Sequence, residues 1–192
     1  MYNDEEFEKF YLVENYRNPP NIIKFAESLV VSTNKFRPNS IPIKTRNGLV
    51  YEGTFDEALD DLLTMKNWGE WAILARTNNE VEEIQKILDE NEVPNVTFKK
   101  GDLDLLELDE LIASDRVKVM TIHTAKGTEL PNVIVVGARR YNEEERKIAY
   151  VAATRAEQAL YWCPSFCKRG HKVRKGIKGA MYDKSNNEVI TF

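Results

Sequence analysis

The sequence contains few of the residues that build metal centres and disulfide scaffolds. It has two cysteines, Cys163 and Cys167, and two histidines, His123 and His171. Two cysteines cannot form a disulfide framework, and two histidines exclude a centre with several histidine ligands. Cys163, Cys167 and His171 follow a C-x3-C-x3-H spacing, but the fourth ligand that structural zinc prefers is not evident. We therefore expect no metal site and interpret Cys163 as a buried thiol at the end of an apolar strand.

Glycine-rich phosphate-binding motifs are also absent. None of the nine glycines is followed by lysine, so the chain has no G-x-x-x-x-G-K-[ST] loop, and it has no G-x-G-x-x-G or G-x-S-x-G motif. A parallel α/β protein that hydrolyses ATP by itself normally needs such a loop to hold the phosphates. Asp109-Glu110 falls in a helical pattern rather than at the end of an apolar strand, which argues against a magnesium site there. The sequence therefore argues against a chain that hydrolyses ATP alone.

Long apolar runs are missing as well. No run reaches the roughly 18–20 residues that a membrane span requires. The N-terminal residues MYNDEE are acidic, whereas a secretory signal begins with a basic segment and continues with an apolar one. These two absences predict a cytoplasmic protein, or a piece of one, with no membrane partner.

The composition that remains is typical of a folded soluble domain. Of 192 residues, 42% are hydrophobic and 30% are charged, and a chain of this length can bury a substantial core. The net charge is −4, and the charges are unevenly distributed along the chain. Residues 101–115 carry six acidic and no basic side chains, whereas residues 163–180 carry six Lys or Arg and no acidic side chain. The basic stretch can contact phosphate or be a solvated tail. We expect residues 1–163 to form one domain and residues 164–192 a basic extension of it, either a hairpin or a tail.

Short apolar runs alternate along the chain with segments of helical periodicity. The runs that predict strands are 11–14, 71–75, 117–122, 133–137 and 159–163. The helical patterns follow Asn18-Pro19, the Thr54/Glu57 capping box and Asn78 or Asn79, and two more cover 103–113 and 143–156. Strands that alternate with helices of about 12 residues predict an α/β fold with a mostly parallel sheet and helices on both faces. The apolar run 133–136 predicts a central strand.

Polar residues interrupt this pattern at three places near predicted strand ends. Ligands of open α/β sheets bind at the carboxyl ends of the strands, so these places are candidates for a site. In the first, Tyr16 can stack on a base and Arg17 can hold phosphate. The structural alternative is that Tyr16 packs in the core and Arg17 pairs with a carboxylate.

The second and third places are segments 119–131 and 148–157. In the second, hydroxyls and free N–H groups suit phosphate oxygens and Glu129 can accept from ribose hydroxyls, unless the segment is an ordinary turn at Gly127. In the third, Arg155 projects from an alanine-rich helix that can lie close to the sheet. Arg155 either reaches a ligand or compensates the helix dipole.

Four segments in this order resemble motifs of the C-terminal motor half of UvrD/PcrA/Rep-type superfamily 1 DNA helicases. VENYRN, followed by an Ile/Phe helix, is similar to the fourth motif of that family, and WAILARTN is similar to its strand and loop that touch single-stranded DNA. VKVMTIHTAKGTELPNVIVVG is similar to the fifth motif and EERKIAYVAATRAEQALYW to the sixth. The resemblance covers residues 11–163, and its last two motifs are long and specific.

This resemblance implies a RecA-like fold of the P-loop NTPase type that lacks its own P-loop, the second of two motor domains. ATP with Mg²⁺ would bind between the domains, and the N-terminal motor domain would supply the phosphate loop and the magnesium carboxylates. By motif position, Arg17 and Arg155 would be arginine fingers on the γ-phosphate. Tyr16 would stack on adenine, Glu129 would bind the ribose side, and Gly127 would shape the loop.

The resemblance also assigns single-stranded DNA to six residues, which would hold sugar and phosphate without reading sequence. These residues are Arg76, Thr77, Asn78, Thr121, His123 and Thr124. Asn78 and His123 also allow a purely structural interpretation, as a helix cap and as a tie within the loop. Large family members carry a long accessory insertion before the fifth motif, whereas only about 40 residues separate Arg76 from Arg116 here.

Two functions stay open at this point. In the first, the chain is the C-terminal half of an ATP-dependent DNA helicase of repair or replication, and is inactive without its N-terminal motor domain. In the second, it is a stand-alone, non-catalytic DNA- or protein-binding module with a degenerate helicase fold. Arg17 and Arg155 discriminate between them, because only the first function needs both arginines.

Overall fold

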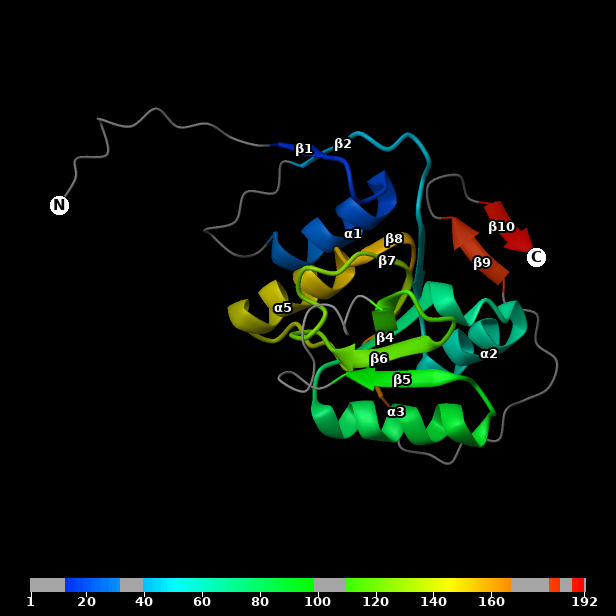
Figure 1. The fold of residues 1–192 in the computed structure, drawn as a ribbon. Helices are drawn as coiled ribbons and strands as arrows, with labels where there is room; N and C mark the ends of the chain where they lie inside the picture. The colour runs from blue at the N-terminus through cyan, green and yellow to red at the C-terminus, as the bar shows by residue number, and fades with distance from the viewer. Residues whose placement is uncertain (1–12, 32–39, 99–109, 167–179, 184–187, 192) are drawn as a thin grey trace.

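A parallel sheet of six strands forms the centre of the molecule. The computed structural model describes residues 13–31, 40–98, 110–166, 180–183 and 188–191. The strands lie in the order β3-β8-β7-β4-β6-β5, and every neighbouring pair is parallel (Figure 1). Their bounds are β3 Leu49–Glu52, β4 Trp71–Ala75, β5 Asn95–Phe98, β6 Val117–Thr121, β7 Leu130–Val136 and β8 Ala156–Cys163. The predicted α/β fold with a mostly parallel sheet is confirmed.

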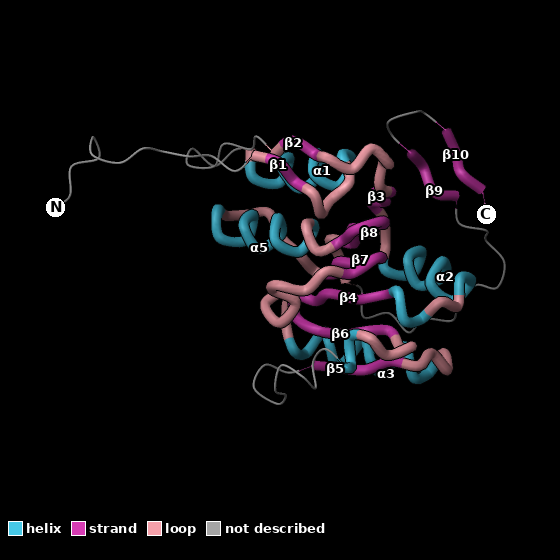
Figure 2. Tube along the Cα trace, turned by 45° about the horizontal axis from the view of Figure 1, so that its top comes forward, coloured by secondary structure: helices cyan, strands magenta, loops and turns pink. Residues whose placement is uncertain are grey.

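Helices cover both faces of this sheet, as predicted (Figure 2). Two of them, α1 and α5, pack on one face, and α2 and α3 pack on the other. Their bounds are α1 Pro20–Val30, α2 Phe55–Met65, α3 Asn78–Glu90 and α5 Glu143–Ala153. The strand β7 lies between β8 and β4 and is buried on both sides: Val133 and Val135 join the α1/α5 core, and Ile134 and Val136 join the α2/α3 core. Successive side chains of a strand point to opposite faces, which is why a central strand is apolar throughout.

The start of each helix tests the predicted caps. Thr54 and Glu57 form the predicted capping box of α2. The predicted cap of α3 at Asn78 or Asn79 is wrong, because Thr77 is the N-cap and forms a capping box with Glu80. A capping box combines Ser or Thr at the cap with Glu or Gln three positions later. Thr77 and Glu80 fit this pattern, whereas Asn78 is followed by Val81, and Asn79, although followed by Glu82, is not Ser or Thr.

The cap predicted at Asn18 is also wrong. Pro19 occupies the N-cap position of α1, and its side chain makes no capping bond. Pro20 is the first helical residue, where the missing N–H costs nothing. The side chain of Asn18 is therefore not used as a cap and is available for a contact elsewhere in the fold.

Several element boundaries differ from the sequence expectations. The short edge strands β3 and β5 were not identified, because they are only partly buried and carry no continuous apolar run. The strand β1 (Glu14–Asn15) pairs with β2 (Ile41–Pro42) outside the main sheet. Most of the helix expected at 103–113 lies outside the described residues, and only Glu110–Ile112 are seen as helical. In the expected basic extension, β9 (Ala180–Asp183) and β10 (Glu188–Thr191) pair as an antiparallel hairpin.

The helix α5 is shorter than predicted, and this changes the position of Arg155. The helix ends at Ala153 and β8 already begins at Ala156, so Arg155 lies in the turn between them rather than on the helix. Ala149, Ala152 and Ala153 are completely buried. Because their side chains are small, α5 lies close to the sheet and brings this turn to the edge of β8.

The connection between β6 and β7 crosses the sheet. These two strands flank β4, so residues 122–129 leave the carboxyl end of β6 and reach the amino end of β7 by passing over β4. Ala125, in the middle of the crossing, is completely buried in the α1/α5 core. The crossing segment therefore begins at the carboxyl edge of the sheet and ends at the amino edge.

Candidate nucleotide cleft and nucleic-acid edge

Glu129 and Arg155 lie next to each other at the amino ends of two neighbouring strands. The parallel strands β7 and β8 pair from Leu130 and Ala156 onward, and the N–H of Leu130 donates to the carbonyl oxygen of Arg155 at 3.2 Å. The expectation that the site lies at carboxyl ends is wrong for these two residues. The crossing segment 122–129 and the helix α5 both return the chain to the amino edge before the next strand begins.

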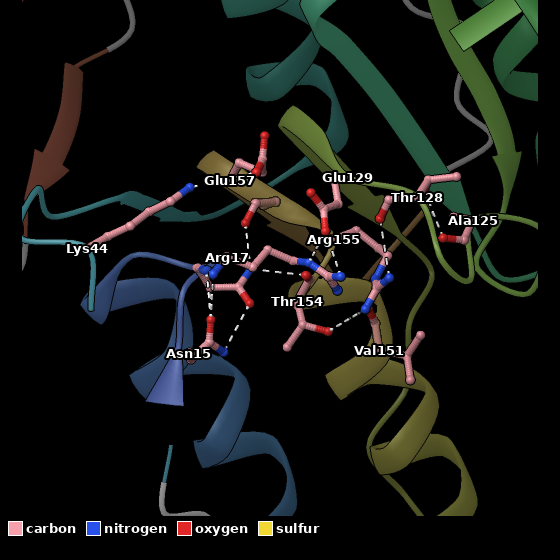
Figure 3. Close-up of polar contacts among 12 residues, drawn as sticks. Asn15, Arg17, Lys44, Ala125, Thr128, Glu129, Val151, Thr154, Arg155 and Glu157 are labelled. Atoms are coloured by element: carbon pink, nitrogen blue, oxygen red, sulfur yellow. Dashed lines mark hydrogen bonds and ion pairs between the residues drawn. The ribbon is translucent and has the colours of Figure 1, made fainter. Parts of the chain in front are cut away.

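Arg155 is buried and donates only to neutral oxygens (Figure 3). Its side chain donates from Nε to Val151 O at 3.0 Å, from Nη1 to Thr128 O at 3.2 Å and from Nη2 to Thr154 Oγ1 at 3.2 Å. The residue is only 9% exposed. Burial, and then the nearby charge of Arg17, lower the pKa of its guanidinium. Among the described residues, no carboxylate forms an ion pair with Arg155, so its charge is open to an external anion.

Arg17 reaches the same cleft from the loop between β1 and α1. Asn15 Oδ1 accepts from the backbone N–H groups of Arg17 at 3.0 Å and of Asn18 at 2.9 Å, which holds the loop as a tight turn. The guanidinium donates from Nε to Glu129 Oε1 at 2.6 Å, and Nη2 lies 2.6 Å from the same oxygen. Figure 3 shows the side chains of Arg17 and Arg155 next to each other, with Glu129 above them.

Asn18 joins the two arginine-bearing segments and was missed as a site residue by sequence reasoning. Its Nδ2 donates to Thr154 O at 3.0 Å and to Ala156 O at 2.8 Å, and the residue is 2% exposed. These carbonyls belong to the residues on either side of Arg155. In the sequence, Asn18 stands before two prolines, which is the pattern of a helix N-cap. This pattern predicts a capping role and not a contact with the residues around Arg155.

Tyr16 lies at the rim of the cleft. Its side chain is 65% exposed, its hydroxyl donates to Glu14, and this bond raises the pKa of the phenol. The cleft has a volume of about 620 Å³. Tyr16, Arg17, Glu129 and Arg155 line it together, but Gly127 does not. Gly127 instead has a φ of +97° in the crossing segment, a conformation that favours glycine.

The residues assigned to DNA lie at the opposite, carboxyl edge of the sheet. Arg76 follows β4 and binds the buried Glu145 of α5, with Nε–Oε2 and Nη2–Oε1 distances of 3.0 and 2.7 Å. This bond raises the pKa of Arg76 and lowers that of Glu145, because each stabilises the charge of the other. Sequence reasoning did not identify Glu145. Three glutamates, Glu143, Glu144 and Glu145, begin α5, and nothing in the sequence distinguishes the third from the other two.

Some of the remaining residues assigned to DNA make structural hydrogen bonds with their side chains, and others do not. Thr77 is used in the capping box of α3, and Asn78 is exposed beside it. Thr121 and Thr124 bond to each other through their hydroxyls at 2.9 Å, which closes the turn after β6. His123 is exposed between them. The structure thus gathers these residues on the loops after β4 and β6.

The cysteine spacing is only partly described. The Cys163 thiol is buried at the end of β8 and lies 3.4 Å from Thr54 O, and burial raises its pKa to about 12. Cys167 and His171 lie outside the described residues. Within the described residues no three His, Cys, Asp or Glu side chains are placed to hold a metal ion. None of the described helices has the length and apolarity that crossing a membrane requires.

The fold defines a RecA-like α/β domain. It is similar to the crystal structure of the C-terminal domain of a possible DNA helicase from Lactobacillus plantarum WCFS1, with a TM-score of 0.53 and 21% sequence identity over 84% of this chain and 95% of that chain. Residues 100–165 match the family of UvrD-like helicase C-terminal domains. The chain therefore contains a UvrD/PcrA-type helicase C-terminal domain.

Curated relatives support the same family. The ATP-dependent DNA helicase PcrA of Staphylococcus epidermidis is 40% identical over 76 residues, which cover 31% of this chain and 10% of that protein. PcrA of Staphylococcus aureus is 38% identical over a segment of the same length and coverage. The chain spans about a tenth of the length of these relatives.

Proposed function

We propose that this chain is the C-terminal motor half of an ATP-dependent DNA helicase or translocase. ATP binds at the amino-edge cleft when an N-terminal motor domain closes over it, and the loops at the carboxyl edge hold single-stranded DNA. The N-terminal motor domain, with its phosphate loop and its magnesium ligands, is part of this proposal. So is the inactivity of this chain alone, which has no phosphate loop.

The observation that carries the proposal is the pair of guanidinium groups in one cleft. Arg155 is buried, donates only to neutral oxygens and has no carboxylate within ion-pair distance among the described residues, although the nearby Glu129 raises the pKa of its guanidinium against the larger effect of burial. A buried cation is costly unless an anion joins it. The γ-phosphate of ATP supplies such an anion, and its charge spreads over more oxygens as it is transferred. Arginine fingers placed to stabilise that charge accelerate phosphoryl transfer by about 10³–10⁵.

The other cleft residues fit the rest of a nucleotide. The exposed ring of Tyr16 at the rim can stack on adenine. The Glu129 carboxylate can accept from ribose hydroxyls, and Arg17 then exchanges this carboxylate for phosphate. Magnesium would neutralise phosphate charge when bound, and we assign it to carboxylates of the N-terminal motor domain.

The helix α5 connects the two edges of the sheet. Glu145 in its first turn binds Arg76 at the carboxyl edge, where the loops assigned to DNA lie. Arg155 follows its last turn at the amino edge, where the nucleotide cleft lies. Its 11 residues span about 16 Å. A shift of Arg155 when the cleft closes on ATP is therefore transmitted to the DNA-holding loops by a rigid element. This arrangement supports coupling of ATP binding to the grip on DNA.

The test uses the protein in which this chain is joined to its N-terminal motor domain. Arg155→Ala should lower DNA-stimulated ATP hydrolysis at least about a thousandfold and leave the affinity for single-stranded DNA nearly unchanged. Arg155→Lys keeps the charge but loses the planar fork, so hydrolysis should stay strongly reduced. Arg116→Ala, which removes an exposed arginine before β6, is the matched control.

Two outcomes would contradict the proposal. Turnover at the wild-type rate by Arg155→Ala would reject the arginine finger. A wild-type protein that binds DNA but hydrolyses no ATP would instead support the non-catalytic module with a helicase fold.

A further inference from the structure

Two exposed side chains of the loop between β7 and α5 have no role in the sites described so far. They are Arg139 and Tyr141. Tyr141 is 68% exposed, which is the highest value for a large hydrophobic side chain among the described residues. Neither side chain forms a hydrogen bond or an ion pair with any other residue in the described part of the chain. An aromatic ring and a cation two positions apart are thus both free to bind a ligand.

The loop that carries them is held firmly by its other residues. The guanidinium of Arg140 packs over the rings of Phe25 and Trp162, with centroid distances of 5.5 and 5.2 Å. The backbone oxygen of Arg140 accepts from Nε of Arg146 at 3.0 Å. Asn142 caps α5 by accepting from the backbone N–H of Glu145 at 2.7 Å. The anchored residues Arg140 and Asn142 alternate along the chain with Arg139 and Tyr141, so these two are presented on the exposed side of a preorganised loop.

The same two residues lie beside the DNA-assigned loops. The backbone N–H of Ile122, after β6, donates to the carbonyl oxygen of Ala75 at the end of β4 at 2.9 Å. Arg139 contributes, after the larger effect of Arg76, to lowering the pKa of Glu145. Asn142, which follows Tyr141, accepts from the backbone N–H of Glu145 at 2.7 Å, and Glu145 binds Arg76 of the loop after β4. The loops after β4, β6 and β7 therefore converge at the carboxyl edge around one buried carboxylate. Glu145 is already paired with Arg76, so the charge of Arg139 is left available to an external anion.

We propose that the loop between β7 and α5 is a further contact for single-stranded DNA, in which Tyr141 stacks on a base and Arg139 binds a neighbouring phosphate. This inference rests on the proposed function. Stacking on an aromatic ring is independent of sequence because every base has a flat face, and unpaired bases are free to stack. A phosphate one nucleotide away suits a guanidinium fork. Because the loop is already ordered, little conformational entropy is lost on binding.

The test measures binding of the 192-residue chain to fluorescein-labelled oligo-dT by fluorescence anisotropy. Tyr141→Ala should weaken binding about five- to hundredfold, the range for loss of one stacked base, and Tyr141→Phe should bind like the wild type. On an abasic oligomer with the same number of phosphates, Tyr141→Ala and the wild type should bind equally. Arg139→Ala should make the slope of log K against log salt shallower by about 0.7, the value for one phosphate of a single strand. Arg116→Ala serves as the control at the opposite edge.

The possible results separate this inference from the function on which it rests. A folded wild-type chain that does not bind oligo-dT would overturn both. Weaker binding by His123→Ala without an effect of Tyr141→Ala would overturn the inference and leave the proposed function standing. An equal loss on abasic and oligo-dT ligands would also overturn it, because the ring would then not act by stacking. Both side chains are exposed, so equal thermal unfolding curves should show that each variant is folded.

Discussion

Nε of Arg17 donates to Oε1 of Glu129 at 2.6 Å, and Nη2 of Arg17 lies 2.6 Å from the same oxygen. The two residues are 112 positions apart in sequence and come from two motifs that the resemblance assigns to the nucleotide. In the proposed complex, Arg17 also binds phosphate. A carboxylate and a phosphate are both anions, so they compete for the one guanidinium. In that proposed complex, Glu129 would therefore limit how strongly Arg17 holds phosphate until the ribose draws the carboxylate away.

Glu129→Gln should raise the affinity of the chain for inorganic tripolyphosphate a few-fold. Tripolyphosphate has no ribose or base, so it reports only on the arginines, and the amide no longer competes with phosphate for Arg17. The free energy of unfolding should change by less than about 1 kcal/mol, because the ion pair is partly exposed. Isothermal titration calorimetry and urea unfolding provide the two measurements. A fall in tripolyphosphate affinity would show that the Glu129 carboxylate orients Arg17 for phosphate instead of competing for it.

Asn18→Ala should lower the free energy of unfolding by about 1–3 kcal/mol. The substitution removes two buried hydrogen bonds and leaves the carbonyls of Thr154 and Ala156 without their partner. Urea unfolding measures the change, and Asn79→Ala, at an exposed position of α3, should stay within about 0.5 kcal/mol of the wild type. Equal stability of the two variants would mean that Asn18 does not tie the Arg17 loop to the Arg155 turn.

Glu145→Gln should produce a pH-dependent loss of stability. Arg76 lowers the pKa of Glu145 in the folded state below its ordinary value of 4.5. The contribution of the carboxylate is therefore complete well above pH 4.5 and is lost as the pH falls through the lowered pKa. Near neutral pH the variant should be about 1–3 kcal/mol less stable than the wild type, and the difference should shrink below pH 4.5.

The measurement for Glu145→Gln is urea unfolding at a series of pH values between neutral and acidic. Glu144→Gln replaces an exposed carboxylate in the same turn of α5 and should differ little from the wild type at any pH. A gap between Glu145→Gln and the wild type that stays constant down to strongly acidic pH would contradict the ion pair with Arg76.

The elements that were predicted correctly depend on local interactions. Thr54 and Glu57 cap α2 through contacts within four residues, and the apolar run of β7 follows from burial on both sides of one strand. The N-cap of α3 was also readable, because Thr77 and Glu80 match the capping-box pattern of Ser or Thr followed three positions later by Glu or Gln. Asn79 has Glu82 at the same spacing, so the hydroxyl side chain of Thr77 is the feature that distinguishes the two positions.

The errors at the site have a different cause. The rule for carboxyl ends failed at Glu129 and Arg155 because the order of strands in the sheet sends segment 122–129 across β4 to the amino edge. Asn18 was misread because its two acceptors lie 136 and 138 positions away. No local pattern contains such partners.

The sequence by itself determined the class of fold, the helix and strand periodicities and the motifs that carry the family resemblance, because these depend on residues close together in the chain. The tertiary structure alone decided which of the motif residues meet. It placed Tyr16, Arg17, Glu129 and Arg155 in one cleft at the amino edge. It also placed Arg76 beside Glu145 at the carboxyl edge, with the exposed Tyr141 nearby. These contacts join residues from opposite ends of the domain, and only the order and parallel register of the strands bring them within bonding distance.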